Sequence, residues 1–194
     1  LTVDARRMMQ WREMMASRGA KPSYNAILML ATARAIRAHP ILNSRLDGET
    51  IQVLRNRNMG LAVETERGLV VVVVPETDSK GVRSIDEVLR EKIDRARSGK
   101  SRVEDLAGST FTITNLGMHD IELFMPIVNP PECGILGAGS IRERPFVDTD
   151  RSVRVRPELQ LALAFDHRIV DGGPAARFLQ QVRDYLEEPL TMLS

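Results

Sequence analysis

The segment Leu159-Gln160-Leu161-Ala162-Leu163-Ala164-Phe165 alternates large apolar residues with smaller or polar ones. A period of two is typical of a β-strand, and here it places the three leucines and Phe165 on one face. Asp166-His167-Arg168-Ile169-Val170-Asp171-Gly172 follows directly, and Gly173-Pro174 then begins a stretch with apolar residues at helical spacing. Proline is tolerated in the first turn of a helix, where its missing N–H would have no partner anyway. The sequence therefore predicts a buried strand that turns into a helix, with a histidine and an aspartate four residues apart at the junction.

Hydrophobic periodicity predicts the remaining elements. Helices are expected at residues 5–18, at residues 22–38, and from the capping box Ser84-x-x-Glu87 to Ser98-Gly99. Strands are expected at residues 59–63, 68–74, 110–114, 134–139, 153–156 and 159–165, with a turn at 46–49 between two short strands. The apolar run Leu69–Val74 is interpreted as a buried strand, and Pro157 as the mark of a bulge or an edge position. This order of elements predicts a mixed α+β fold around one large sheet.

Length and composition exclude several classes of protein. A chain of 194 residues is most simply one domain, spanning residues 1–194. Lys plus Arg number 27 and Asp plus Glu number 26, and the charges are mixed along the chain, which argues against a nucleic-acid-binding protein. No apolar run approaches the roughly 20 residues of a membrane helix, so no membrane association is expected. The single cysteine, Cys133, cannot form an intramolecular disulfide and is interpreted as a packing residue.

The remaining histidines and glycines do not form a recognisable cofactor site. His39 precedes Pro40 at a helix end, where a positive charge is favourable, and it is interpreted as structural. His119 is expected to be structural or peripheral. Three scattered histidines and one cysteine lack metal-ligand spacing, so no metal site is predicted. Gly137-Ala138-Gly139 lacks the third glycine of a dinucleotide-binding fingerprint.

Five blocks of sequence, in the same order, resemble the acyltransferase catalytic domain of dihydrolipoamide acyltransferases. These enzymes are the E2 components of 2-oxo acid dehydrogenase complexes, and chloramphenicol acetyltransferase is a relative. The blocks are Gly68-Leu69-Val70 with Val74-Pro75, Phe111–Met118, Pro126–Pro131, Ile135–Gly139 and Asp166–Gly172. The resemblance covers roughly residues 20 to 190, and several separated blocks in order are far more specific than any one of them.

The resemblance implies a fold and a setting. The expected fold is α+β, a two-layer sandwich in which helices flank a large mixed β-sheet, as in chloramphenicol acetyltransferase. Catalytic domains of the family carry more sequence before the point at which this chain begins, so the N-terminal part of the domain is expected to be missing. The implied location is the cytoplasm, or the mitochondrial matrix in a eukaryote.

The resemblance also implies a reaction, in which an acyl group moves between the thiols of dihydrolipoamide and coenzyme A. A thiol with a pKa of roughly 8.5 needs a base to become a nucleophile, and histidine is well matched to that task. His167 is expected to be the general base for direct attack, and the Thr114 hydroxyl to stabilise the oxyanion, at a position where the family motif has serine. Asp171 is expected to orient the histidine turn by pairing with an arginine or a backbone group. Asn115 and Gly172 are weaker candidates for the substrate site, with Gly172 allowing a backbone conformation that a side chain would hinder.

The expected partners follow from the same resemblance. Coenzyme A is a substrate, and the lipoyl group is carried on a separate domain. The chain is expected to form a homotrimer in which His167 of one copy meets Thr114 of the next, and trimers can assemble into a cubic or dodecahedral core. E1 and E3 components are expected to attach through upstream domains. Two alternatives remain open: a non-catalytic scaffold core, and a coenzyme A-dependent O-acetyltransferase acting on a hydroxyl acceptor.

Overall fold

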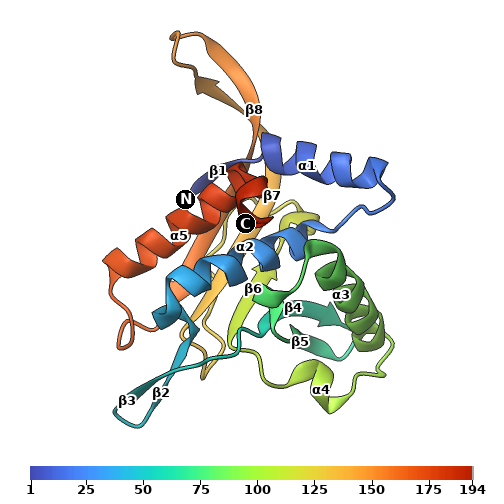
Figure 1. Cartoon of the computed structure of the whole chain (residues 1–194), viewed down its shortest axis with the longest axis vertical. Coiled ribbons are helices and arrows are strands. Elements are labelled where there is room, and N and C mark those ends of the chain that lie inside the picture. The colour runs from blue at the N-terminus through green and yellow to red at the C-terminus, as the bar shows by residue number, and fades with distance from the viewer. Residues whose placement is uncertain (194) are drawn as a thin grey trace.

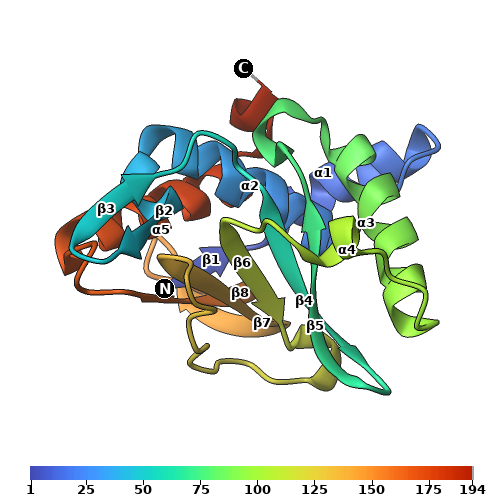
Figure 2. The same ribbon diagram turned by 90° about the horizontal axis from the view of Figure 1, so that it is seen from below.

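The computed structural model describes residues 1–193 and consists of a six-stranded sheet with helices on one face (Figures 1 and 2). The strand order is β1-β8-β7-β6-β4-β5, and β2 and β3 form a separate hairpin. The strands are β1 (Thr2–Asp4), β2 (Ser44–Asp47), β3 (Thr50–Val53), β4 (Met59–Thr65), β5 (Gly68–Val74), β6 (Phe111–Asn115), β7 (Gly134–Val147) and β8 (Val153–Phe165). The α-helices are α1 (Arg6–Ser17), α2 (Tyr24–Ala38), α3 (Val82–Arg97), α4 (Val103–Leu106) and α5 (Gly172–Glu187). The 3₁₀ turns are η1 (Pro40–Asn43), η2 (Thr77–Ser79), η3 (Gly117–His119) and η4 (Pro189–Leu193).

The large sheet is mixed, as the sequence predicted. Strand β6 runs parallel to both of its neighbours, β4 and β7, whereas the other pairings are antiparallel. Parallel neighbours need crossover connections, and α3 supplies the one between the β4–β5 hairpin and β6. Strand β6 is therefore a central strand; its first three residues are buried, and its last two, Thr114 and Asn115, are half-buried.

Helix α2 is the centre of the core. It is buried along almost its whole length, as its nearly continuous apolar sequence predicted, and it packs against both α5 and α3. The Phe111 ring of β6 meets the Phe178 ring of α5 edge to face, with centroids 5.6 Å apart. Figure 2 shows α1, α2 and α5 on the same side of the sheet, where they bury the inward-facing side chains of β6, β7 and β8.

The opposite face of the sheet is covered by the long connection between η3 and β7 rather than by helices (Figure 2). This connection lies so close to β7 that a Cβ on Gly139 would stand 1.8 Å from the Glu122 carbonyl oxygen. Phe124 and Pro126 point inward against Gly137. The glycines of Gly137-Ala138-Gly139 thus permit close backbone approach.

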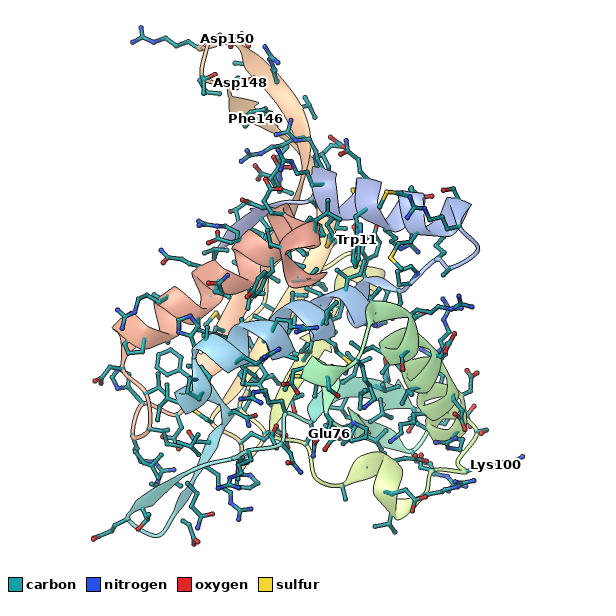
Figure 3. All side chains as sticks on the ribbon, viewed as in Figure 1. Trp11, Glu76, Lys100, Phe146, Asp148 and Asp150 are labelled. Carbon is teal, nitrogen blue, oxygen red and sulfur yellow. The ribbon has the colours of Figure 1, made fainter. Side chains whose placement is uncertain are left out.

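Strands β7 and β8 are much longer than their apolar segments predicted, and together they form an arm that projects from the body (Figures 1 and 3). Pro157 lies within one continuous strand and faces Glu143, so the predicted separation of residues 153–156 from 159–165 is wrong. The predicted edge position fits, because β8 pairs with β1 only at residues 158–160 and Pro157 lies just beyond that ladder. The register shift lies instead between Ala138 and Ile141 of β7. In the outer part of the arm, one residue before the end of β7, the Phe146 ring lies beside two guanidinium groups, with Arg156 4.4 Å from its centroid.

Three further local predictions require correction. Helix α3 begins at Val82 after Gly81, so the predicted capping box at Ser84 does not form, because Ser84 already lies inside the first turn. Strand β5 is an edge strand with Leu69 72 % exposed, and only its last three residues are buried. Residues 2–4, for which no element was predicted, form β1 because they pair with β8. Among residues 1–193, none of the helices combines the length and apolar character of a membrane span.

Candidate active site

The turn that carries His167 is fixed by Asp166, the residue before it. The Asp166 N–H donates to the Cys133 carbonyl oxygen at 2.7 Å, and its own carbonyl accepts the N–H groups of Ile169 and Val170. Its carboxylate accepts the backbone N–H of Arg168 at 3.0 Å and pairs with the Arg168 guanidinium at 2.7 Å. The hydrogen bond from Arg168 holds the pKa of the Asp166 carboxyl below its usual value. The backbone on both sides of His167 is therefore held rigidly.

The His167 side chain itself projects into solvent. It is 72 % exposed, and its ring centroid lies 5.7 Å from that of Phe165. Its Nδ1 lies 3.7 Å from Oδ1 of Asp171, which is longer than a hydrogen bond. Nδ1 is the ring nitrogen on the side of Asp171.

Two sequence-based expectations about this turn do not hold. Among the described residues, Asp171 pairs with neither an arginine nor a cap backbone group; its side chain is 85 % exposed and lies beside that of His167. Arg168 is taken by Asp166, which explains why Asp171 has no arginine. Gly172 has no left-handed backbone angle, and a Cβ there would meet nothing within 4 Å, so no conformational reason requires glycine.

Thr114 lies where the sheet splits. The β4–β6 ladder ends at Leu61 opposite Ile113, one residue before Thr114. Beyond that point β4 continues with β5, whereas β6 continues with β7, where Thr114 faces Gly137. The divergence opens a groove of about 850 Å³ beside Thr114, which is called the Thr114 groove below.

Ionisable residues from three distant segments of the chain line the Thr114 groove. Glu64 comes from the end of β4, Arg97 from the end of α3 and His119 from η3. His119 Nε2 lies 3.8 Å from a Glu64 carboxylate oxygen. The sequence predicted only a structural or peripheral role for His119, and nothing in the local pattern of Glu64 or Arg97 indicated that they would meet.

Asn115 joins the Thr114 groove to a second hollow. Its side-chain N–H donates to the Asn25 Oδ1 at 2.7 Å, and its Oδ1 accepts the N–H of Gly117. Both asparagines and Met118 line the groove and also a neighbouring hollow of about 360 Å³, called the Asn25 hollow below. Asn115 is therefore both a turn-stabilising residue and part of the wall beside Thr114.

A buried carboxylate ties β6 to the connection that precedes β7. Glu132 is only 5 % exposed and accepts hydrogen bonds from the Thr112 hydroxyl at 2.6 Å, from Asn129 at 3.1 Å and from the Ser109 hydroxyl. Burial raises the pKa of Glu132, and the three donors only partly offset this. Thr112 and Thr114 lie on the same face of β6, so Glu132 fixes the strand that carries Thr114.

Burial disfavours the charged forms of Cys133 and His39. Burial raises the pKa of the Cys133 thiol to about 11, which fits the predicted packing role. Burial and the neighbouring Arg177 lower the pKa of His39, so the predicted favourable positive charge is not supported there. Within residues 1–193, no group of three or more histidine, cysteine or carboxylate side chains is placed to hold a metal ion.

A single chain keeps His167 and Thr114 apart. Thr114 faces Gly137 on β7, and Gly137 faces Ala162 on β8, so the two groups are separated by two strand spacings. Phe165 is the last strand residue before the turn, and it lies three residues beyond Ala162 along β8. Two strand spacings of about 4.8 Å across the sheet and three residues of about 3.3 Å along the strand place its Cα about 14 Å from that of Thr114. His167 lies beyond the end of β8 and does not line the Thr114 groove.

A model of the family described as 2-oxoacid dehydrogenases acyltransferase (catalytic domain) matches residues 1–194. The chain belongs to this family. Among curated relatives of this acyltransferase domain, the acetyltransferase component of the acetoin cleaving system of Bacillus subtilis is 41% identical over 175 residues. The succinyltransferase component of the 2-oxoglutarate dehydrogenase complex of Rickettsia bellii is 37% identical over 175 residues. Each alignment covers 90% of this chain and 44% of the relative, so the chain spans less than half the length of these proteins.

Solved structures confirm the fold of the acyltransferase domain. A structure of Azotobacter vinelandii dihydrolipoamide acetyltransferase (E2p), and one of the cubic core of a pyruvate dehydrogenase multienzyme complex, each match with a TM-score of 0.93 and 30% identity. Both comparisons cover 100% of this chain and 82% of the other. A chloramphenicol acetyltransferase matches with a TM-score of 0.60 at 17% identity, over 96% of this chain and 86% of that one. At that identity the likeness shows the fold alone, and it confirms the predicted two-layer architecture.

Proposed function

We propose that this acyltransferase domain moves an acyl group between dihydrolipoamide and coenzyme A, with His167 as general base and Thr114 as oxyanion donor. The observation that carries the proposal is the rigid turn at the end of β8, which presents an exposed imidazole within a family of acyltransferases. A turn fixed on both sides holds a base in position, while exposure leaves it accessible to a thiol.

The reaction balances without a covalent enzyme intermediate. His167 Nε2 takes the proton of the attacking thiol, and the thiolate forms a new C–S bond to the thioester carbonyl carbon. The carbonyl oxygen becomes an oxyanion, to which the Thr114 hydroxyl donates a hydrogen bond. When the tetrahedral intermediate collapses, the original C–S bond breaks, and His167 returns its proton to the departing thiolate.

The assignment of residues is supported by the A. vinelandii enzyme, whose study concerns the catalytic roles of a serine, a histidine and an asparagine. In that enzyme the asparagine follows the histidine by 4 positions, and the serine precedes it by 52. Here Asp171 follows His167 by 4 positions, and Thr114 precedes it by 53. Threonine keeps the hydroxyl of serine. Aspartate keeps a side-chain oxygen of asparagine but, when ionised, adds a charge and lacks the amide N–H donors.

The separation of His167 from Thr114 supports a site shared between copies of the chain. A cyclic homotrimer would bring His167 of one copy to the Thr114 groove of the next, and each of three equivalent interfaces would then complete one site. One structural neighbour is the cubic core of a multienzyme complex, which supports further association of such trimers. The lipoyl group would arrive on a separate domain, and E1 and E3 components would attach through other domains of the whole protein.

A thioester transfer assay tests the proposal. The purified chain is mixed with acetyl-CoA or another acyl-CoA and with dihydrolipoamide, and acyl-dihydrolipoamide is measured while the oligomeric state is determined by light scattering. Turnover that depends on His167 supports the acyltransferase. A trimer without turnover on any thioester would support the scaffold alternative, and transfer to a hydroxyl acceptor in preference to a thiol would support the O-acetyltransferase.

A further inference from the structure

The Asn25 hollow adjoins the Thr114 groove, in which the thioester is proposed to bind. Asn115 follows Thr114 in β6, and Asn25, Asn115 and Met118 line both the Thr114 groove and the Asn25 hollow. A thioester held in the Thr114 groove would therefore lie beside the boundary that the groove shares with the hollow. A short acyl chain that extends from the thioester carbonyl can cross the boundary at the Asn25–Asn115 hydrogen bond.

The walls of the Asn25 hollow are apolar or neutral. Met8, Leu28, Ile141 and Leu159 contribute hydrocarbon or thioether surface, and the polar residues there are Tyr24, Ser140 and the two asparagines. None of the residues that line the hollow within the described chain carries a charge. The hollow therefore suits an alkyl chain.

Two arginines contact residues that line the hollow, and both already have other partners. The Arg12 guanidinium lies 4.6 Å from the centre of the Tyr24 ring, and it also binds the Pro22 carbonyl and Glu13. Arg142 donates to the Ser140 hydroxyl and pairs with Asp120 at 2.8 Å. A carboxylate on the acyl chain would enter the hollow without a free cation to balance it, and burying an unpaired charge is strongly unfavourable.

We propose that the Asn25 hollow binds the acyl chain of the thioester and selects uncharged acyl groups over succinyl. The inference rests on the proposed function, and it goes further by naming the substrate class. Relatives of both kinds exist, since one is an acetyltransferase component and another is a succinyltransferase component. The apolar lining of the hollow favours an uncharged acyl group over succinyl in this chain. Each methylene group buried there strengthens binding roughly fourfold, whereas a buried carboxylate weakens it.

The rival arrangement places a succinyl carboxylate on Arg97 in the Thr114 groove. Glu64 and Glu66 line the same groove, so a carboxylate there would meet two like charges as well as the guanidinium. The two arrangements predict opposite preferences between butyryl-CoA and succinyl-CoA. These donors have acyl chains of the same length and differ only at the terminal carbon, which is a methyl group in one and a carboxylate in the other.

The test measures kcat/KM for butyryl-CoA and succinyl-CoA with dihydrolipoamide as acceptor. We expect butyryl-CoA to be preferred by at least about tenfold. In Met118→Lys, which adds a cation at the boundary of the hollow on an exposed side chain, the preference should fall at least about tenfold. Val103→Lys makes a similar exchange at an exposed position of α4, remote from the hollow, and should keep the wild-type ratio. Ile141→Ala shortens a side chain that lines the hollow, so it should admit longer acyl chains and raise the ratio of kcat/KM for hexanoyl-CoA to that for butyryl-CoA.

Equal or better transfer from succinyl-CoA by the wild type would overturn the inference, and loss of that transfer in Arg97→Met would then assign the carboxylate to the groove. An unchanged butyryl-to-succinyl ratio in Met118→Lys would also overturn it. If the wild type transferred no acyl group from any donor, the proposed function would fail and this inference with it. Transfer with a preference for succinyl would defeat the inference alone.

Discussion

Asp166 binds Arg168 twice, through the backbone N–H at 3.0 Å and through the guanidinium at 2.7 Å, and the residue enclosed between them is His167. The pair is a local device, because both partners belong to the same turn. Asp166 also connects this turn to the start of β7 through the Cys133 carbonyl. His167 is thus positioned by the residues on either side of it rather than by Asp171.

Replacing Asp166 should therefore reduce catalysis more than stability. In Asp166→Ala the turn loses both carboxylate contacts, and a small displacement of the imidazole should lower kcat about 10-fold to 10²-fold with a near-native circular dichroism spectrum. The matched control is Asp184→Ala, which removes an exposed carboxylate paired with Arg183 at 2.8 Å in α5 and should leave kcat unchanged. Equal activity in the two variants would show that Asp166 does not position the base.

Removal of the imidazole should nearly abolish acyl transfer. His167→Ala deletes an exposed side chain, so the fold should persist, while the rate of thioester transfer should fall by about 10² to 10⁴, the range usual for loss of a general base. Asp171→Asn is the matched control and should keep most of the activity, since a relative carries asparagine at this spacing. A folded His167→Ala variant with near-normal turnover would remove His167 from the mechanism.

Two substitutions at Thr114 distinguish the contribution of its hydroxyl from that of its side-chain shape. Thr114→Ser keeps the donor and should retain most activity, whereas Thr114→Val keeps the shape and should lose on the order of 10²-fold in kcat. The Kd of coenzyme A, measured by calorimetry, should change little in either variant. A valine variant as active as the wild type would require a different oxyanion donor.

The buried Glu132 should make stability depend on pH. Burial raises its pKa above the usual 4.5, so the folded state holds this proton more tightly than the unfolded chain. The resulting stabilisation is fully present below pH 4.5 and is lost as pH rises through the raised pKa. Glu132→Gln removes this titration while keeping a side chain of the same shape.

Urea unfolding of both proteins from pH 4.5 to pH 8 measures this effect. The free energy of unfolding of Glu132→Gln minus that of the wild type should increase as pH rises. Only the wild type loses the stabilising contribution of the protonated carboxyl. Other titrating groups are common to both proteins and cancel in the difference. Parallel pH profiles would mean that Glu132 titrates alike in the folded and unfolded states.

The sequence predicted the elements whose residues face a core. The alternation of Leu159–Phe165 and the apolar spacing after Pro174 correspond to the end of β8 and to α5, because both pack against buried neighbours. The outer parts of β7 and β8 could not be predicted this way. In the arm the strands pair with each other beyond the body of the protein, so no buried face imposes alternation on their sequence.

The sequence likewise predicted some residues of the candidate site and not others. His167 and Thr114 lie in continuous motifs, and the sequence was sufficient to select them. The Thr114 groove arises from the divergence of β4 and β6, and it gathers Glu64, Arg97 and His119 from segments far apart in the chain. Glu132 could not be identified either, because its burial depends on hydroxyl donors that precede it by 20 positions or more.

The central claim is that His167 and Thr114 act on one substrate from two copies of the chain. Subunits of His167→Ala and Thr114→Val, each nearly inactive alone, are mixed in equal amounts under conditions where subunit exchange is shown by mass spectrometry. In a randomly mixed cyclic trimer, about one interface in four combines an intact His167 with an intact Thr114, so activity should return to about one quarter of the wild-type level. If exchange is complete and the mixture remains as inactive as the separate variants, the two residues do not form a shared site.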